Sequence, residues 1–169
     1  QQAIEVDPKN EHWYYSGLGS LYGTLPSVDS AIAVYQQASK FDPTDADYHN
    51  GLGHLYHAMK QYDEAIAAYQ QAIQLDPTAA RYHYHLAKLY RDQNRKDDAI
   101  AAYEQAIQLD PTAASYHNSL AHLYREQKRN DKAMAAYQQA IKLNPTHGRY
   151  HDDLGDLYRK LRRYDDAIA

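Results

Sequence analysis

Apolar residues recur along the chain at spacings of three and four, in two runs separated by a short polar stretch. In the segment 46–79, the first run contains Leu52 and Leu55 and the second contains Ala65 and Tyr69. Such spacing places the apolar side chains on one face of an α-helix. The pattern therefore predicts two amphipathic helices joined by a turn, which together form a helical hairpin.

The two-run pattern returns every 34 residues. Prolines in the motifs Asp-Pro-Thr and Asn-Pro-Thr mark this period, at Pro43, Pro77, Pro111 and Pro145. Pro8 precedes Pro43 by 35 residues, so the first interval holds one extra residue. With proline at position 32, we expect one array over 1–169: the tail of a preceding unit at 1–11, full units at 12–45, 46–79, 80–113 and 114–147, and a partial unit at 148–169.

Each unit is expected to hold a helix A over positions 2–14 and a helix B over positions 18–30. An aspartate at position 18 suits the start of helix B, because a carboxylate is favourable near a helix N-terminus. The proline at position 32 ends helix B, since it cannot continue the hydrogen-bond ladder and disfavours helical geometry in the preceding residue. We expect the threonine after that proline to cap the next helix A.

Small residues and tyrosines also keep fixed places in the unit. Position 7 is leucine, positions 8, 20 and 27 are glycine or alanine, and positions 11 and 24 are tyrosine. With the 34-residue period, this pattern resembles the tetratricopeptide repeat family over the whole chain. The resemblance implies an all-α fold, a right-handed solenoid of stacked antiparallel helix pairs. Small residues would allow the helices to approach closely, and tyrosines would fill the remaining gaps.

Two positions depart from the family pattern. Position 4, usually a large aromatic residue, is histidine in four units: His49, His83, His117 and His151. We expect these to be partly buried packing residues with one hydrogen bond each, and a ladder of histidines predicts stability that depends on pH near 6. Position 15, often glycine, carries none, which leaves the turn between helices A and B open.

Composition excludes several classes of function. The net charge of −4 lacks the basic excess of a nucleic-acid binder. No apolar run is long enough to enter a membrane. The chain has no cysteine, no phosphate-binding loop and no HExxH motif, so we expect no catalytic residue, no cofactor and no enzyme activity. His54 and His57 lack a third ligand, so we expect no metal. The absence of a signal-like start favours the cytoplasm over export without deciding the compartment.

The resemblance implies that helix A lines a concave groove, through positions 2, 5, 6, 9, 12 and 13. The middle of this groove is basic and rich in hydrogen-bonding groups, so we expect a protein or peptide ligand of acidic or polar character. The arrangement of residues that clamps chaperone C-termini in some family members is not matched. The candidate binding residues are Asn50, His54, Arg81, Tyr84, His85, Lys88, Asn118, His122 and Arg125.

The favoured interpretation is a non-catalytic scaffold for protein–protein interaction. One alternative is a substrate-presenting or regulatory arm of a larger enzyme. Another is a structural assembly subunit that associates through its open ends. The chain starts and stops inside a helix B pattern, so we expect a piece of a longer array, with head-to-tail self-association as the further possibility.

Overall fold

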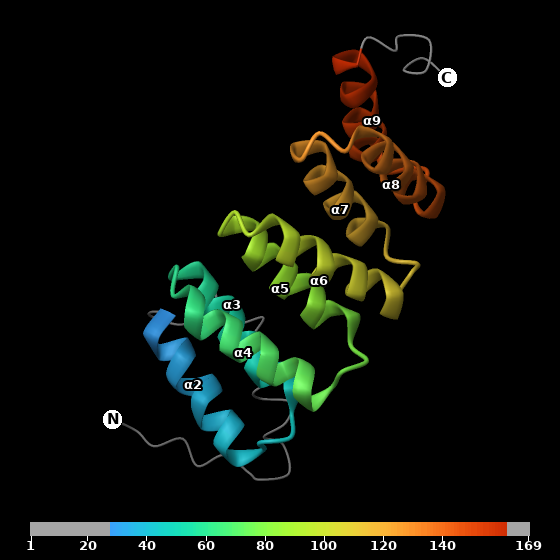
Figure 1. The fold of residues 1–169 in the computed structure, drawn as a ribbon. Coiled ribbons are helices and arrows are strands. Elements are labelled where there is room, and N and C mark those ends of the chain that lie inside the picture. Colours follow the sequence, from blue (N-terminus) through green and yellow to red (C-terminus); the bar gives the residue numbers. More distant parts are fainter. Residues whose placement is uncertain (1–27, 162–169) are drawn as a thin grey trace. The chain divides into compact units, whose positions relative to one another are not determined.

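The computed structural model describes residues 28–161, so the expected tail at 1–11 and the start and end of the array lie outside the described residues. All regular structure in 28–161 is helical (Figure 1). The helices are α2 (Val28–Phe41), α3 (Ala46–Ala58), α4 (Tyr62–Leu75), α5 (Ala80–Asp92), α6 (Lys96–Leu109), α7 (Ala114–Glu126), α8 (Asn130–Leu143) and α9 (Gly148–Lys160).

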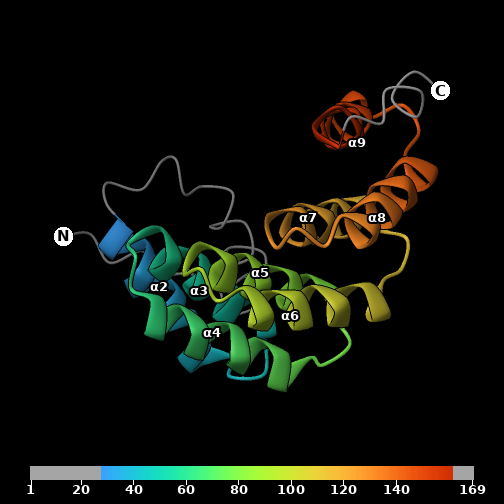
Figure 2. The same cartoon turned by 45° about the horizontal axis from the view of Figure 1, so that its top comes forward.

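The chain divides into two compact units, Gln1–Thr78 with α2–α4 and Ala79–Ala169 with α5–α9. In the first unit α3 and α4 form an antiparallel hairpin, and α2 packs on α3. In the second unit α5 pairs with α6 and α7 with α8, while α6 packs on α7 and α8 on α9 (Figure 2). The predicted all-α class of stacked antiparallel helix pairs is confirmed, and each helix begins within one residue of its expected start.

Close packing within each hairpin rests on the small residues and on the tyrosine at position 24. Alanines at positions 20 and 27 are fully buried, and so are Tyr69, Tyr103 and Tyr137. A Cβ atom added to Gly53 would come within 2.6 Å of the Tyr69 ring. The tyrosine ring therefore lies directly against the backbone of helix A, which explains why position 8 accepts only small residues.

A second tyrosine, at position 11, links helix B to the next helix A at three junctions, α2 to α3, α6 to α7 and α8 to α9. Gln36 Nε2 donates to the Tyr56 hydroxyl at 3.1 Å, and Gln138 Nε2 donates to the Tyr158 hydroxyl at 3.2 Å. Between α6 and α7, position 25 is Glu104 instead of glutamine, and its carboxylate accepts from the Tyr124 hydroxyl at 2.7 Å. The glutamine-rich helices B thus supply one bond of the same kind at each of these three junctions.

The threonine caps expected for helix A are wrong. Thr78, for example, donates its hydroxyl and its backbone N–H to Asp76 Oδ1, at 2.7 and 3.1 Å. The aspartate two residues earlier is the nearer partner, and it closes a local turn around the proline. Helix α3 is capped by Asp45 instead, whereas α5, α7 and α9 have no side-chain cap bond at their N-termini.

The turn between helices A and B is left-handed although it lacks glycine. Lys60, Asn94 and Lys128 at position 15 have φ angles of 61°, 59° and 59°. In each turn the next residue donates its N–H to the carbonyl of the residue five positions earlier, as in Arg129 N to Tyr124 O at 2.9 Å. This is the Schellman arrangement, which usually ends on glycine because a Cβ atom is strained at positive φ.

Replacement of Lys128 by glycine should therefore stabilise the protein. Relief of the strained φ outweighs the extra backbone entropy of glycine, so we expect Lys128→Gly to raise the free energy of unfolding by about 0.5–1 kcal/mol. Urea denaturation measures the change. The matched control, Lys142→Gly inside α8, should lower that free energy by about 1 kcal/mol. Equal destabilisation by both substitutions would contradict the prediction.

Candidate functional site

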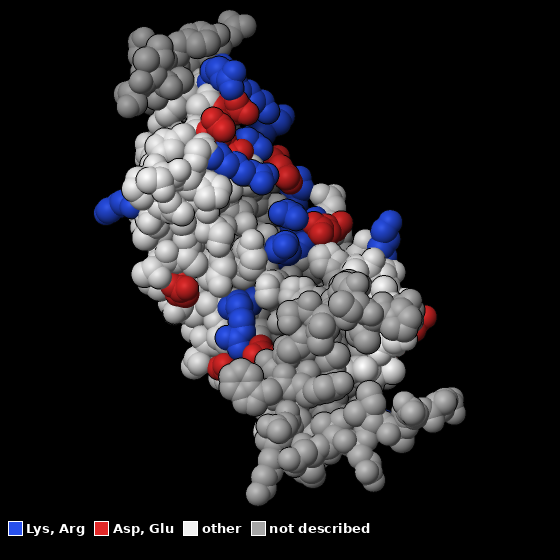
Figure 3. Space-filling view, turned by 180° about the vertical axis from the view of Figure 1, so that it is seen from behind, with Lys and Arg blue, Asp and Glu red and all other residues white. Residues whose placement is uncertain are grey.

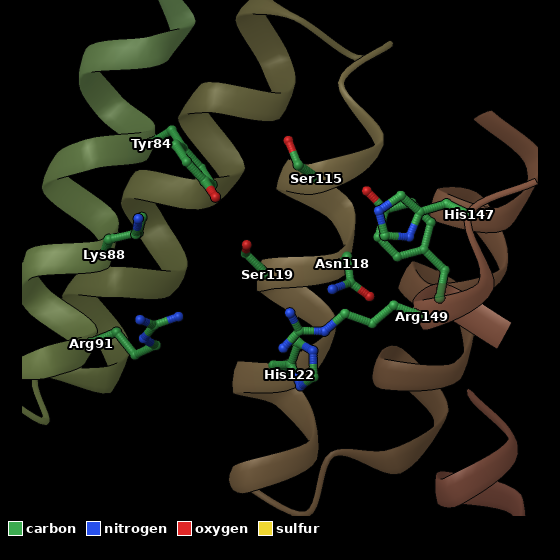
Figure 4. A pocket seen from close by; sticks show the side chains of 10 residues that line it. Tyr84, Lys88, Arg91, Ser115, Asn118, Ser119, His122, His147 and Arg149 are labelled. Atoms are coloured by element: carbon green, nitrogen blue, oxygen red, sulfur yellow. The ribbon is translucent and has the colours of Figure 1, made fainter. Parts of the chain in front are cut away.

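The second compact unit contains a hollow of about 360 Å³ between α5, α7 and the start of α9 (Figure 4). These three helices are the helices A of successive repeats, so the hollow lies on the helix A side, where the resemblance implied a groove. Its walls are formed by Tyr84, Lys88, Arg91, Ser115, Asn118, Ser119, His122, His147, Arg149 and Tyr150.

The structure brings some of the predicted binding residues together and separates others. Tyr84, Lys88, Asn118 and His122 line the hollow. The remaining candidates in this unit lie on the same two helices but outside its lining: Arg81, His85 and Arg125. Two candidates lie on α3 of the first unit: Asn50 and His54.

Six further residues line the hollow. Arg91, Ser115, Ser119 and Arg149 occupy groove positions 2, 6 and 12, so the repeat register already pointed to them. The other two, at positions 34 and 3, carried no such signal: His147 and Tyr150. They lie where the chain enters α9, and their rings stack with centroids 4.1 Å apart and planes 13° apart.

The lining carries three cations and no carboxylate. Arg91 is partly neutralised, because its Nε and Nη2 atoms donate to Asp92 Oδ1 at 3.1 and 3.0 Å. Within residues 28–161, no ion pair or hydrogen bond engages the Lys88 ammonium or the Arg149 guanidinium. Lys88 does lie 5.7 Å from the centre of the Tyr84 ring. These two cations are therefore available to a ligand.

The surface elsewhere has mixed charge. On the face shown in Figure 3, positive and negative side chains of the described residues lie intermingled. Several form ion pairs near the turns between helices A and B, as in Arg95 with Asp98 at 2.7 Å and Lys96 with Glu126 at 3.4 Å. The uncompensated positive charge of the hollow differs from this pattern of mutual neutralisation.

His122 lines the hollow, and hydrogen bonds hold its ring in place. Its Nδ1 atom accepts from the Tyr137 hydroxyl at 3.1 Å and from Arg125 Nη2 at 3.0 Å. These partners assign the proton to Nε2, which lies 2.9 Å from Asp153 Oδ2 on α9. Burial lowers the pKa of His122, the Arg125 charge acts in the same direction, and Asp153 opposes both. His122 is thus held neutral and ties α7 to α9.

The same histidine–tyrosine pair occurs in the first unit, where His54 Nδ1 lies 3.1 Å from the Tyr69 hydroxyl. His54 and His57 were examined above as a metal pair. Within the described part of the chain, no three residues of the metal-ligating types come together. In the same residues no helix is both long enough and apolar enough to span a membrane.

The position-4 histidines behave largely as expected. His117 and His151 donate from Nε2 to the carbonyls of Pro111 and Pro145, at 3.0 and 2.9 Å. Partial burial is confirmed for His49, His83 and His117, but His151 is exposed. Burial lowers the pKa of His49, with Asp45 opposing.

Comparison with known proteins identifies the repeat. The sequence matches the family described as TPR repeat over residues 27–60 and 53–93, and the family described as tetratricopeptide repeat over 84–148 and 118–169. The chain belongs to the tetratricopeptide repeat family. No curated protein sequence matches it.

Solved structures of tetratricopeptide repeat proteins resemble the fold. A crystal structure of MamA is 28% identical, with 89% of this chain and 88% of that chain covered and a TM-score of 0.78. PilF of Pseudomonas aeruginosa is 22% identical, with 95% and 73% covered and a TM-score of 0.84. YrrB, described as a TPR protein with an unusual peptide-binding site, is 18% identical, with 91% and 79% covered and a TM-score of 0.70. Membership of the family supports a protein-interaction scaffold in general terms.

The bonds of His122 predict how stability responds to pH. Because folding lowers its pKa below the ordinary 6.5, the unfolded chain binds the proton first on acidification. This contribution to stability is complete above about pH 6.5 and is lost as the pH falls toward the folded value. We expect the free energy of unfolding from urea titrations to decrease between pH 7.5 and 5.5, and to decrease less in His122→Gln.

The control for this titration is His147→Gln, an exposed histidine on the same hollow. It removes an imidazole from the hollow and leaves the bonds of His122 to Tyr137 and Arg125 in place. Parallel curves for the wild type and His122→Gln would show that His122 does not carry the effect.

Proposed function

We propose that the hollow between α5, α7 and α9 binds an extended segment of a partner protein that carries acidic side chains. The observation that carries this proposal is the pair of cations, Lys88 and Arg149, without partners among the described residues. Charged groups left unpaired in a concave site favour a ligand of opposite charge. A volume of about 360 Å³ suits a few side chains of a peptide rather than a folded domain.

The shape of the lining supports an extended ligand. Side chains from three successive helices A line the hollow, so a peptide segment that crosses these helices contacts side chains of each repeat in turn. Polar hydroxyl groups of Ser115 and Ser119 lie between the cations of α5 and α9 (Figure 4). The predicted residues outside the hollow, namely Asn50, His54, Arg81, His85 and Arg125, remain proposed binding residues along the path of a longer ligand.

The alternatives from the sequence remain predictions: an arm of a larger enzyme, or a subunit that associates through its ends. Neither has an observation in residues 28–161 that favours it over the scaffold. A scaffold is also the coarser function that the family supports.

A peptide-display selection tests the proposal directly. Random peptides displayed on phage are selected on the wild-type protein, and the enriched peptides are synthesised and measured by fluorescence anisotropy. We expect them to be acidic. We expect Lys88→Glu/Arg149→Glu to weaken their binding at least a hundredfold, because each lost charge-assisted hydrogen bond is worth about 1.5–3 kcal/mol.

The control variant is Lys132→Glu/Lys142→Glu, which makes the same change of charge at exposed positions of α8, outside the hollow. It should bind the peptides within about twofold of the wild type, a small effect typical of remote surface charges. Equal weakening by both variants, or enrichment of neutral peptides, would reject the hollow as the acidic-peptide site.

A further inference from the structure

Asn118 on α7 is the buried polar residue of the described chain, with only 8% of its surface exposed, and it lines the hollow. Its Oδ1 atom has no hydrogen-bond partner. An unsatisfied buried acceptor of this kind costs about 1–3 kcal/mol. The packing of the helices does not require this cost, since an apolar residue of equal size would avoid it. The amide oxygen is covered in this structure, so an N–H group of a ligand reaches it only when the Asn118 side chain turns toward the hollow.

Two cations approach the same space from opposite sides. In Figure 4 Lys88 projects from α5 toward α7, and Arg149 reaches from the start of α9 past Asn118 toward His122. Arg91 adds a third positive charge, which Asp92 offsets. The lining thus presents two cations without an ion-pair partner among the described residues, Lys88 and Arg149, and a doubly charged group matches both of them. The Asp153 carboxylate on the far side of His122 offsets part of this positive charge.

Lys88 stands where the adjacent units have histidine. At this position His54 and His122 each bond the hydroxyl of the tyrosine at position 24. An ammonium group has donors only and cannot accept that bond. Tyr103 therefore has no histidine acceptor, although its ring is fully buried. The substitution gives up the histidine bond, leaves Ser119 as the polar side chain beside the Tyr103 hydroxyl, and places a cation on the hollow, which indicates that the cation serves a ligand.

We propose that the hollow recognises a phosphorylated residue of the partner segment. The phosphoryl group lies between Lys88 and Arg149, and the Asn118 side chain turns so that its Oδ1 accepts from a backbone N–H beside that group. At pH 7 such a group carries about −1.5 to −2 charges and three strong acceptor oxygens, which match the two free cations and the hydroxyl of Ser119. This inference rests on the proposed peptide-binding function and narrows its ligand class.

The test uses small probes on the full chain, followed by NMR titration of the Asn118 side-chain amide and the Arg149 Nε–H signals. The probes are N-acetyl-phosphoserine N-methylamide, the glutamate equivalent, the phosphoserine probe with both amide nitrogens methylated, and inorganic phosphate. We expect the phosphoserine probe to bind at least tenfold more tightly than each of the other three. Lys88→Met and Arg149→Met should each weaken it at least tenfold.

Asn118→Leu separates a binding role from a structural one. Because leucine removes the unsatisfied oxygen at similar volume, we expect the variant to melt at the same temperature as the wild type or higher. It should nevertheless bind the phosphoserine probe at least fivefold more weakly, and bind the doubly methylated probe as the wild type does. A large loss of melting temperature would show that Asn118 serves the fold instead, and would overturn its assignment to the ligand.

The remaining outcomes are also decisive. Equal affinity for the glutamate and phosphoserine probes would overturn the doubly charged ligand while leaving acidic-peptide binding intact. Equal affinity for inorganic phosphate would overturn recognition of the backbone N–H. If no probe shifts the NMR signals of Asn118 and Arg149 while the display-selected peptides still bind in the hollow, the phosphoryl proposal fails and the peptide-binding proposal stands. If those peptides also bind the Lys88→Glu/Arg149→Glu variant with wild-type affinity, both proposals fail.

Discussion

The hydroxyl of a buried tyrosine needs a hydrogen-bond partner, and much of this structure follows from how that need is met. Tyr69 and Tyr137 fill the space between paired helices, and each finds a histidine Nδ1 atom at 3.1 Å. This bond orients the histidine ring, and at His122 the Arg125 guanidinium, which can only donate, makes Nδ1 the acceptor and so fixes the tautomer. In α7 the ring then aims Nε2 at Asp153 on α9. One internal bond therefore satisfies the core of a repeat, joins it to the next repeat and sets one wall of the hollow.

Cohesion between repeats is spread over many modest contributions. Helices of 13 or 14 residues are marginal in isolation, so their stability comes from stacking. Each bond between position 25 and the tyrosine at position 11 contributes about 0.5–1.5 kcal/mol. At Tyr124 burial, together with the hydrogen bond and charge of Glu104, raises the pKa to about 12, so the hydroxyl stays a donor over the physiological range. The strained residue in each turn opposes these gains, which shows that packing, not the turn, determines where the helices meet.

The repeat made the fold predictable, because each position is seen several times, once every 34 residues, and an exceptional residue in one unit does not hide the residue type that the other units share. The helix bounds, the small residues and the tyrosines all followed from it. The register also assigned Lys88 and Asn118 to one face of helix A. It did not show that Arg81 turns back to its own neighbour Tyr82, with 2.6 Å between Nη2 and the hydroxyl, because side-chain rotation is not periodic. Nor did it show that His147 and Tyr150 close the hollow, since both depend on how the chain enters α9. The threonine caps failed because the N-cap of each helix A is the residue after the threonine, as at Asp45 and Ala79, so the threonine hydroxyl bonds back to the aspartate instead.

In an array of near-identical units, the departures from the pattern locate function better than the pattern itself. Every repeat must satisfy the same packing requirements, so a residue that weakens them in one unit is not explained by folding. Unit 80–113 has Lys88 where its neighbours have histidine, and Tyr84 where they have asparagine. Tyr84 stacks on Tyr116 with centroids 4.6 Å apart, so the two rings hold each other in place on this wall. The unit gives up the histidine acceptor for Tyr103 and gains a cation held beside an aromatic ring. Next to it, Asn118 keeps a buried oxygen unpaired. These costs fall on opposite walls of one hollow, and a ligand that carries both negative charge and an N–H donor would offset both.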